Sequence, residues 1–271
     1  MIGNNELSDI LGKEVIFLGA PKKFTRNNVR YYLIDDNKKV IKEHDSDLFF
    51  YKEKINYPLL QNEPGILVPS AQFYPKHRLI VIDYIKRITN RNIEDAVLDW
   101  GGIHSNNFGR KSLSKRKAGS LKWVNELIED LKSHKGCCSE YADDYINYLK
   151  SVSPIFELPS WKTLVHGDLR SVNISPTKKG NYYYDLEFTG EGHPAEDIAP
   201  IVLEEPERKE QIIQMYLEKT QFNKETFLRE LEAHIVLRAL SILTVYEDRN
   251  INSEIKERVI QKFTDVIGEI I

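Results

Sequence analysis

The stretch that decides the fold runs from His166 to Asn173 and reads HGDLRSVN. Its Asp168 and Asn173 are five positions apart, and a second aspartate, Asp185, stands 12 positions after Asn173, behind an aromatic run. Carboxylate and amide oxygens are the ligands that Mg²⁺ prefers, and a carboxylate can also accept or orient the proton of an attacking hydroxyl. The spacing therefore predicts phosphoryl transfer, with Asp168 acting on the hydroxyl and with Asn173 and Asp185 as metal ligands.

Two short apolar runs flank these residues. Residues 161–165 and 182–184 read as buried strands, because they are rich in β-branched and aromatic side chains. We expect the two strands to be neighbours. The polar residues that follow each strand would then project from adjacent strand ends into one cleft.

The segment 165–199 resembles the catalytic core of the aminoglycoside phosphotransferase and choline kinase superfamily. The matching residues are His166-Gly167-Asp168, Asn173, Asp185 and Asp197-Ile198-Ala199. Gly167 stands where protein kinases usually carry Arg, and Glu187 makes the DLEF segment similar to choline kinases. The resemblance implies an α+β, two-lobed protein-kinase-like fold, with a small antiparallel-sheet lobe and a larger, mainly helical lobe.

The resemblance also implies roles for residues around the catalytic loop. Glu187 is expected to join the metal ligands, and Asp197 to brace the loop through hydrogen bonds. We expect His166 to shape the loop and to satisfy buried hydrogen bonds, not to transfer protons. Arg170 has two equal interpretations. It either stabilises charge on the transferred phosphate, or it forms an ion pair with a carboxylate, for which the candidates are Glu187, Glu191 and Asp197.

The amino-terminal part reads as a five-strand, one-helix lobe. The predicted strands are residues 14–19, 29–35, 39–43, 72–74 and 78–84, and residues 47–60 read as the helix. Helical spacing dominates beyond residues 85–92, so we divide the chain into a nucleotide-binding lobe, 1–88, and a catalytic and acceptor-binding lobe, 89–271. Helices are predicted there over residues 93–104, 122–133, 139–150, 207–219, 224–246 and 253–270.

Lys42 is the predicted phosphate-contacting lysine of the small lobe. Strand alternation puts Lys42 on the same face as apolar Val40, whereas Lys39 points to the opposite face. An inward lysine needs a partner, and Glu53 on the following helix is the best candidate, unless both are ordinary surface charges. Backbone groups near Asp83 and Ile85, at the end of the last strand, are predicted to bind a purine edge.

The loop after the first strand, residues 19–28, contains a single glycine, so a Gly-x-Gly-x-x-Gly motif is absent. Small-molecule kinases of the resembled superfamily often lack this motif. The sequence leaves open which backbone amides cover the phosphates and whether ATP or GTP is preferred.

Composition narrows the class of protein. The 271 residues carry a formal net charge of -3, which gives no basic excess for general nucleic-acid binding. The two cysteines are adjacent, at 137 and 138, and no apolar run approaches the ~20 residues that span a bilayer. We expect a cytoplasmic protein without a membrane segment, and the sequence does not predict its oligomeric state.

These observations predict an ATP- or GTP-dependent, Mg²⁺-dependent phosphotransferase that acts on a small hydroxylated acceptor, with a cationic acceptor as one option. An aminoglycoside-type antibiotic is the first candidate, and a metabolic alcohol such as choline, ethanolamine or an amino sugar is the alternative. A nucleotide-binding pseudokinase is the alternative from another class. Acidic residues that could line a pocket for a polycation, or simply begin a helix, are Glu191, Glu196, Glu204, Glu205, Glu207, Glu247 and Asp248.

Overall fold

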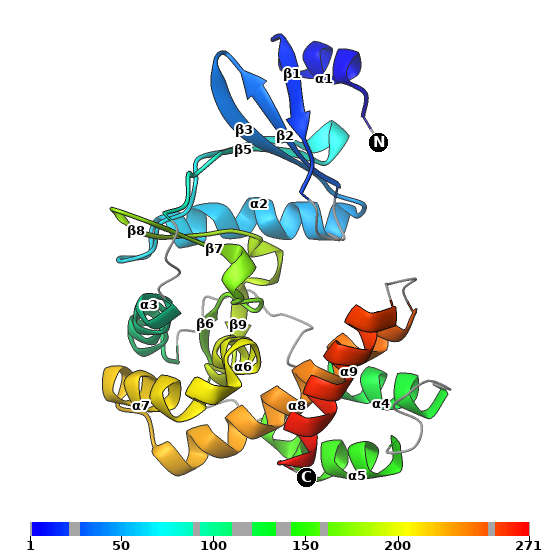
Figure 1. Ribbon diagram of the computed structural model, residues 1–271. Helices are drawn as coiled ribbons and strands as arrows, with labels where there is room; N and C mark the ends of the chain where they lie inside the picture. The colour runs from blue at the N-terminus through cyan, green and yellow to red at the C-terminus, as the bar shows by residue number, and fades with distance from the viewer. Residues whose placement is uncertain are drawn as a thin grey trace. The chain divides into compact units, whose positions relative to one another are not determined.

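The computed structural model describes residues 2–21, 28–88, 93–109, 121–133, 142–157, 162–248 and 253–270. The chain forms two compact units (Figure 1). The first comprises Met1–Arg91 and Val172–Glu187, and the second comprises Asn92–Ser171 and Phe188–Ile271. A small antiparallel-sheet unit and a larger helical unit confirm the expected fold class. Residues 172–187 are grouped with the first unit. The domain boundary that we proposed from the sequence, after residue 88, had placed them in the second lobe.

The first unit is built on a five-stranded antiparallel sheet in the order β1-β2-β3-β5-β4. The strands are β1 (Val15–Gly19), β2 (Asn28–Ile34), β3 (Asn37–Glu43), β4 (Ala71–Tyr74) and β5 (Leu79–Asp83). The turn between β2 and β3 is made by Asp35 and Asp36, whose φ angles are 48° and 59°. Two successive residues with positive φ match the right-handed twist of paired strands, which favours a tight hairpin here.

The two faces of this sheet pack against different helices. On one face Tyr32, Ile41 and Val81 form a core with Leu7 of α1 (Asn4–Leu11). On the other face, the rings of Tyr57 in α2 (Asp47–Gln61) and Phe73 in β4 lie 5.4 Å apart. Helix α1 corrects the expectation of a single helix in this lobe, because its eight residues are too few to show a clear apolar period.

Residues 172–187 form a hairpin of β7 (Ile174–Thr177) and β8 (Gly180–Tyr183) within the first unit. The amide of Tyr183 donates to the carbonyl of Leu67 at 2.9 Å. Arg87 donates to Ser175 Oγ at 2.8 Å and to the carbonyl of Val172 at 2.7 Å. These bonds fasten both strands of the hairpin to the first unit.

The second unit is mainly helical. Its helices are α3 (Ile93–Asn106), α4 (Leu121–Ser133), α5 (Ala142–Val152), α6 (Ala195–Glu204), α7 (Lys209–Thr220), α8 (Lys224–Asp248) and α9 (Ser253–Gly268), with strands β6 (Thr163–Val165) and β9 (Gly190–Gly192). Short 3-10 turns in the chain span Pro75–His77, Ser153–Glu157, Ser171–Asn173, Leu186–Phe188 and Pro206–Arg208. Helix α6 was not expected, since it is almost wholly buried and contains Pro200, so it shows no amphipathic stripe.

The predicted pairing of the strands that precede His166 and Asp185 is wrong. β6 pairs with β9, and β8 pairs with β7, so the strands that precede His166 and Asp185 belong to separate two-stranded sheets. The physical reason lies in β9, because its sequence is Gly-Glu-Gly and carries no strand signal that could have named it as the partner of β6.

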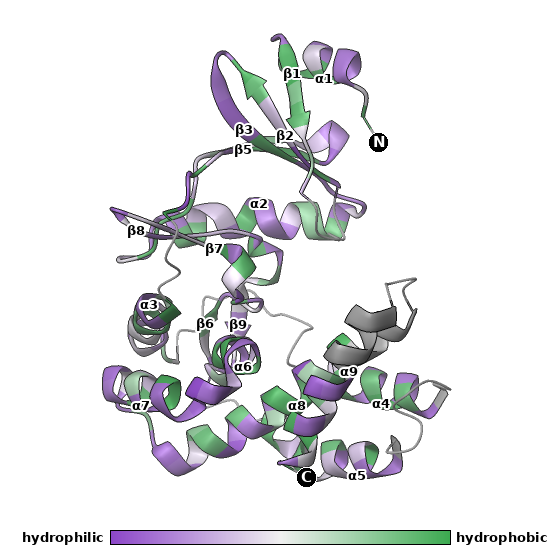
Figure 2. Cartoon of the chain, viewed as in Figure 1, coloured by the Kyte–Doolittle hydropathy of each residue, from purple (hydrophilic) through white to green (hydrophobic). Residues whose placement is uncertain are grey.

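One strand of the described sheet has exposed hydrophobic side chains. β1 is at one end of the sheet order, and Figure 2 shows it as a hydrophobic strand. Its residues Ile16, Phe17 and Leu18 are about half exposed, at 50%, 47% and 48%. Among the helices in the described ranges, none is long and apolar enough to cross a bilayer.

Candidate functional site

Lys42 and Glu53 form the ion pair that the sequence predicted. Lys42 lies opposite Ile80 in the β3–β5 ladder, and Ile80 lies opposite Phe73, so all three side chains share the face that α2 covers. Lys42 Nζ is 2.6 Å from Glu53 Oε2, and both side chains are buried. Burial opposes the charged ammonium, but nearby Asp185, Glu53 and Glu187 more than offset it, and the pKa of Lys42 is raised well above its usual value.

Lys39 and Asp83 pair with each other and not with this cluster. Their side chains form an ion pair in which both partners are partly exposed. The backbone amide of Asp83 donates to the carbonyl of Ser70 at 2.9 Å, so in this structure that amide is not free to bind a purine edge.

The β7–β8 hairpin explains the spacing between Asn173 and Asp185. Ile174 lies opposite Tyr183, and the amide of Tyr184 donates to the carbonyl of Asn173 at 3.0 Å. The hairpin therefore closes next to Asn173 and brings it beside the residue that precedes Asp185. Asp185 adopts a left-handed backbone conformation with φ 63°, which Asp and Asn tolerate better than most residues.

Asp185 and Glu187 both reach Lys42. Asp185 Oδ1 forms an ion pair with Lys42 Nζ, and Glu187 Oε2 is 3.3 Å from the same nitrogen. Asn56 on α2 donates to the carbonyl of Leu186 at 2.7 Å and so holds the intervening residue. The sequence interpretation missed Asn56, although it lies three residues after Glu53 and so shares its helix face.

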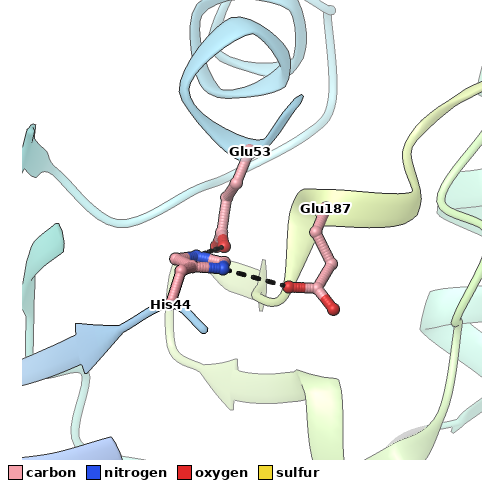
Figure 3. A group of neighbouring side chains, drawn as sticks. All are labelled: His44, Glu53 and Glu187. Atoms are coloured by element: carbon pink, nitrogen blue, oxygen red, sulfur yellow. Dashed lines mark hydrogen bonds and ion pairs between the residues drawn. The ribbon is translucent and has the colours of Figure 1, made fainter. Parts of the chain in front are cut away.

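His44 is a second residue that the sequence interpretation missed. It is buried between Glu53 and Glu187, as Figure 3 shows. Its Nε2 is 2.8 Å from Glu53 Oε2, and its Nδ1 is 3.6 Å from Glu187 Oε2, which is an ion-pair distance and not a hydrogen bond. The only sequence signal is its position two residues after Lys42, which places it on the same face of an extended chain.

The side chains of this cluster are of the types that bind divalent cations. One lysine faces three carboxylates, those of Glu53, Asp185 and Glu187. Ligand atoms of His44, Glu53 and Glu187 lie within 4.8 Å of one another. However, the Lys42 ammonium donates to the same oxygens of Glu53 and Glu187 that His44 faces, so these oxygens already have a cationic partner. Three carboxylates around one lysine nevertheless leave the cluster with an excess of negative charge.

In the second unit, Asp197 braces the His-Gly-Asp loop as expected. Asp197 is fully buried, and its two oxygens accept from the amides of His166 at 2.8 Å and Gly167 at 2.7 Å. His104 Nε2 lies 3.1 Å from Asp197 Oδ2. Burial opposes the charge on Asp197, but the bonds from His104 and His166 outweigh it, so its pKa is lowered. Gly167 has a φ of 79°, a left-handed backbone conformation that glycine adopts easily because it has no side chain.

His166 contacts the loop that we expected it to shape. Its ring is buried, and Nδ1 lies 3.3 Å from the amide of Asp168, which donates to it. The ring also packs edge-on against Trp100, with centroids 5.5 Å apart. His166 therefore supports the backbone immediately before Asp168.

Asp168 lies between two arginines. Arg170 Nη2 donates to Asp168 Oδ2 at 2.7 Å, and Arg238 Nη2, from the middle of α8, contacts Asp168 Oδ1. Burial opposes the charge on Asp168, but Arg238 and Arg170 outweigh it and lower the pKa of Asp168 to about 2. The predicted ion-pair partners of Arg170 were Glu187, Glu191 and Asp197. Asp168, which is only two residues away in the sequence, was not considered as a partner. Arg238 was not predicted at all.

Most of the acidic residues proposed for an acceptor pocket are engaged in structural contacts. Glu191 pairs with Lys162 at 3.4 Å, and Glu205 pairs with Arg208 at 2.6 Å. Glu196 accepts from the amide of His193 at 3.0 Å, and Glu204 accepts from the amide of Ser171 at 2.8 Å. Glu207 is exposed. The side chains of Glu247 and Asp248 are outside the described residues, as are residues 22–27 of the loop after β1, Cys137, Cys138 and Trp161.

Comparison with solved structures identifies the fold. Choline kinase LicA from Streptococcus pneumoniae superposes with a TM-score of 0.73 at 17% identity, over 98% of this chain and 97% of that chain. A thermostable mutant of aminoglycoside phosphotransferase APH(4)-Ia gives a TM-score of 0.72 at 12% identity, over 98% and 99%. A candidate fructosamine-3-kinase from Thermobifida fusca gives 0.71 at 13%, over 98% and 97%.

LicA has also been solved with AMP, and the APH(4)-Ia mutant with ADP and hygromycin B. No protein-family model matches the sequence, and no curated protein matches it at a significant level. The chain therefore shares the two-lobed fold of these small-molecule kinases at low sequence identity.

Proposed function

We propose that this chain is a small-molecule kinase that transfers the γ-phosphoryl group of ATP or GTP to a hydroxyl group. The observation that carries the proposal is the β7–β8 hairpin, which brings Asn173 beside the Asp185 segment and sets Asp185 against the Lys42–Glu53 ion pair. Hard oxygen ligands next to a buried lysine are what a metal-bound triphosphate requires. Asp168 lies only five positions before Asn173 in the sequence.

Each residue has a distinct part in this mechanism. Asn173, Asp185 and Glu187 are the residues that would hold Mg²⁺, and the metal when bound neutralises charge on the phosphates. Lys42, fixed by Glu53, donates to phosphate oxygens. Asp168 is ionised at neutral pH, because its pKa is about 2. A carboxylate with so low a pKa is a weak base, so its first task is to orient the acceptor hydroxyl and accept its hydrogen bond.

The acceptor is proposed to be a small hydroxylated molecule. The fold is shared with proteins described as a choline kinase and as an aminoglycoside phosphotransferase, and one of these binds hygromycin B. An antibiotic and a metabolic alcohol therefore both remain candidates. The structural contacts of Glu191, Glu196, Glu204 and Glu205 lend no support to a polycation pocket built from those residues. Retention of Asp168, Asn173 and Asp185 favours an enzyme over a pseudokinase.

The test is nucleotide consumption with Mg²⁺ across aminoglycosides, other hydroxylated antibiotics and amino alcohols. We expect one acceptor class to stimulate turnover, and we expect Asp168→Asn and Asp185→Asn each to lower it by at least about 100-fold. Asp47→Asn is the matched control, because this carboxylate is 76% exposed. Wild-type turnover by Asp168→Asn would show that the role assigned to Asp168 is wrong.

A further inference from the structure

The surroundings of Asp168 contain a positive charge that the proposed chemistry does not use. Within the second unit two guanidinium groups, Arg170 and Arg238, meet one carboxylate, and each contacts a different oxygen of it. The side chains of Arg170 and Arg238 are 38% and 24% exposed, so both are partly open to solvent. Arg238 is therefore a cation beside Asp168 to which the proposed chemistry assigns no role.

Arg238 has donors to spare for such an anion. A guanidinium carries five N–H donors in a planar fork, and among the described residues Asp168 is the only one to which Arg238 is hydrogen-bonded or ion-paired. Its Nε is buried and has no hydrogen-bond acceptor within the described part of the chain. A buried N–H without an acceptor is costly, and an oxyanion with two oxygens can satisfy neighbouring donors of the fork together.

We propose that Arg238 binds an oxyanion next to Asp168, in the second unit. This oxyanion is carried either by the acceptor, as a carboxylate or phosphate near its reacting hydroxyl, or by the transferred phosphoryl group. The inference deepens the proposed kinase function and rests on it for the identity of the oxyanion. The binding itself does not depend on turnover.

Direct binding of inorganic phosphate tests the inference. Phosphate affinity is measured by calorimetry on the full chain at constant ionic strength, for wild type and for Arg238→Gln. Charge-assisted hydrogen bonds from a guanidinium are strong, so we expect affinity to fall about tenfold or more in Arg238→Gln and less in Arg238→Lys, which keeps the charge but loses the fork. Circular dichroism checks that each variant is folded.

Arg229→Gln is the matched control. Arg229 lies on the same helix, is exposed, and undergoes the same change of charge. We expect its phosphate affinity to stay within about twofold of wild type, as for surface charges in general. The inference is overturned if wild type does not bind phosphate, or if Arg238→Gln binds it as tightly as Arg229→Gln does.

Matched acceptors distinguish the two sources of the oxyanion. Sugars, sugar acids and amino sugars, such as glucose, gluconate and glucosamine, are compared by nucleotide turnover. If wild type prefers the sugar acids and Arg238→Gln does not, the oxyanion belongs to the acceptor. If Arg238→Gln instead lowers nucleotide turnover by the same factor with every acceptor that is a substrate, the oxyanion belongs to the transferred phosphoryl group. A preference for amino sugars over the matched acids excludes the acceptor as the source of the oxyanion, and the inference is then overturned unless Arg238→Gln lowers turnover equally with every acceptor. Phosphate binding without nucleotide turnover in any class would contradict the proposed function and leave the oxyanion site standing.

Discussion

Replacement of Asp197 by Asn should destabilise the second unit by about 2–4 kcal/mol. Asp197 Oδ1 accepts from the amide of Gly167, and Oδ2 accepts from the amide of His166 and faces His104. An asparagine keeps the shape but turns one acceptor into a donor, so at least one buried N–H loses its partner, at about 1–3 kcal/mol. The bonds that remain lose the strength of a charged acceptor, which adds about 1 kcal/mol.

Tryptophan fluorescence during urea unfolding is a suitable assay. The tryptophans at 100, 123 and 161 all fall in the sequence of the second unit, so the signal reports the unit that contains Asp197. Trp100 is fully buried and packs against His166, which makes it sensitive to the braced loop. We expect the unfolding midpoint to fall while the slope stays unchanged.

Glu232→Gln is the control for the Asp197 experiment, because it removes one negative charge from an exposed position on α8. We expect it to change stability by less than about 0.5 kcal/mol. If Asp197→Asn were no more destabilising than Glu232→Gln, the two backbone bonds would not be the support that we infer, and the loop would have to be held by other contacts.

Three further predictions concern other buried groups. Lys42→Met leaves the buried Glu53 carboxylate without its ammonium, so the first unit should lose about 3–5 kcal/mol, measured by circular dichroism in urea. Asn56→Ala removes the donor to the Leu186 carbonyl and should cost about 1–3 kcal/mol, with faster amide exchange near residue 186 as the check. Since the pKa of Asp168 is about 2 in the folded chain against 3.8 ordinarily, its ionisation contributes ~2 kcal/mol above pH 4, and this is lost as the pH falls towards 2. Acid titration of Asp168→Asn should lack that loss, and an unchanged acid transition would refute the assignment.

The sequence was most informative where one local rule sufficed. Strand alternation distinguished Lys42 from Lys39, and helical spacing identified Glu53 as the partner of Lys42, which the structure confirms. The brace at Asp197 came from the family resemblance and not from a local rule. The contacts that hold it, from the His166 and Gly167 amides, could not be read from side-chain types because the donors belong to the backbone.

The residues that the sequence did not reveal depend on distant partners. Arg238 stands 70 positions from Asp168, within a helix that was recognised only by its apolar core stripe, so nothing in the sequence indicated the partner of this arginine. His44 is a single histidine after a strand, and its role appears only when α2 and the Asp185–Glu187 segment fold against it. Long-range pairing of this kind is set by tertiary packing, which a single sequence does not display.

The hydrophobic β1 strand has a consequence for handling the protein. It ends the sheet order within the described residues and exposes three successive apolar side chains, Ile16, Phe17 and Leu18. A terminal strand of this kind is a template on which a second molecule can add a strand, and a net charge of only -3 offers little repulsion against such contact. Self-association should therefore rise with protein concentration, and a lysine at position 16 or 18 should reduce it without touching the residues around Lys42.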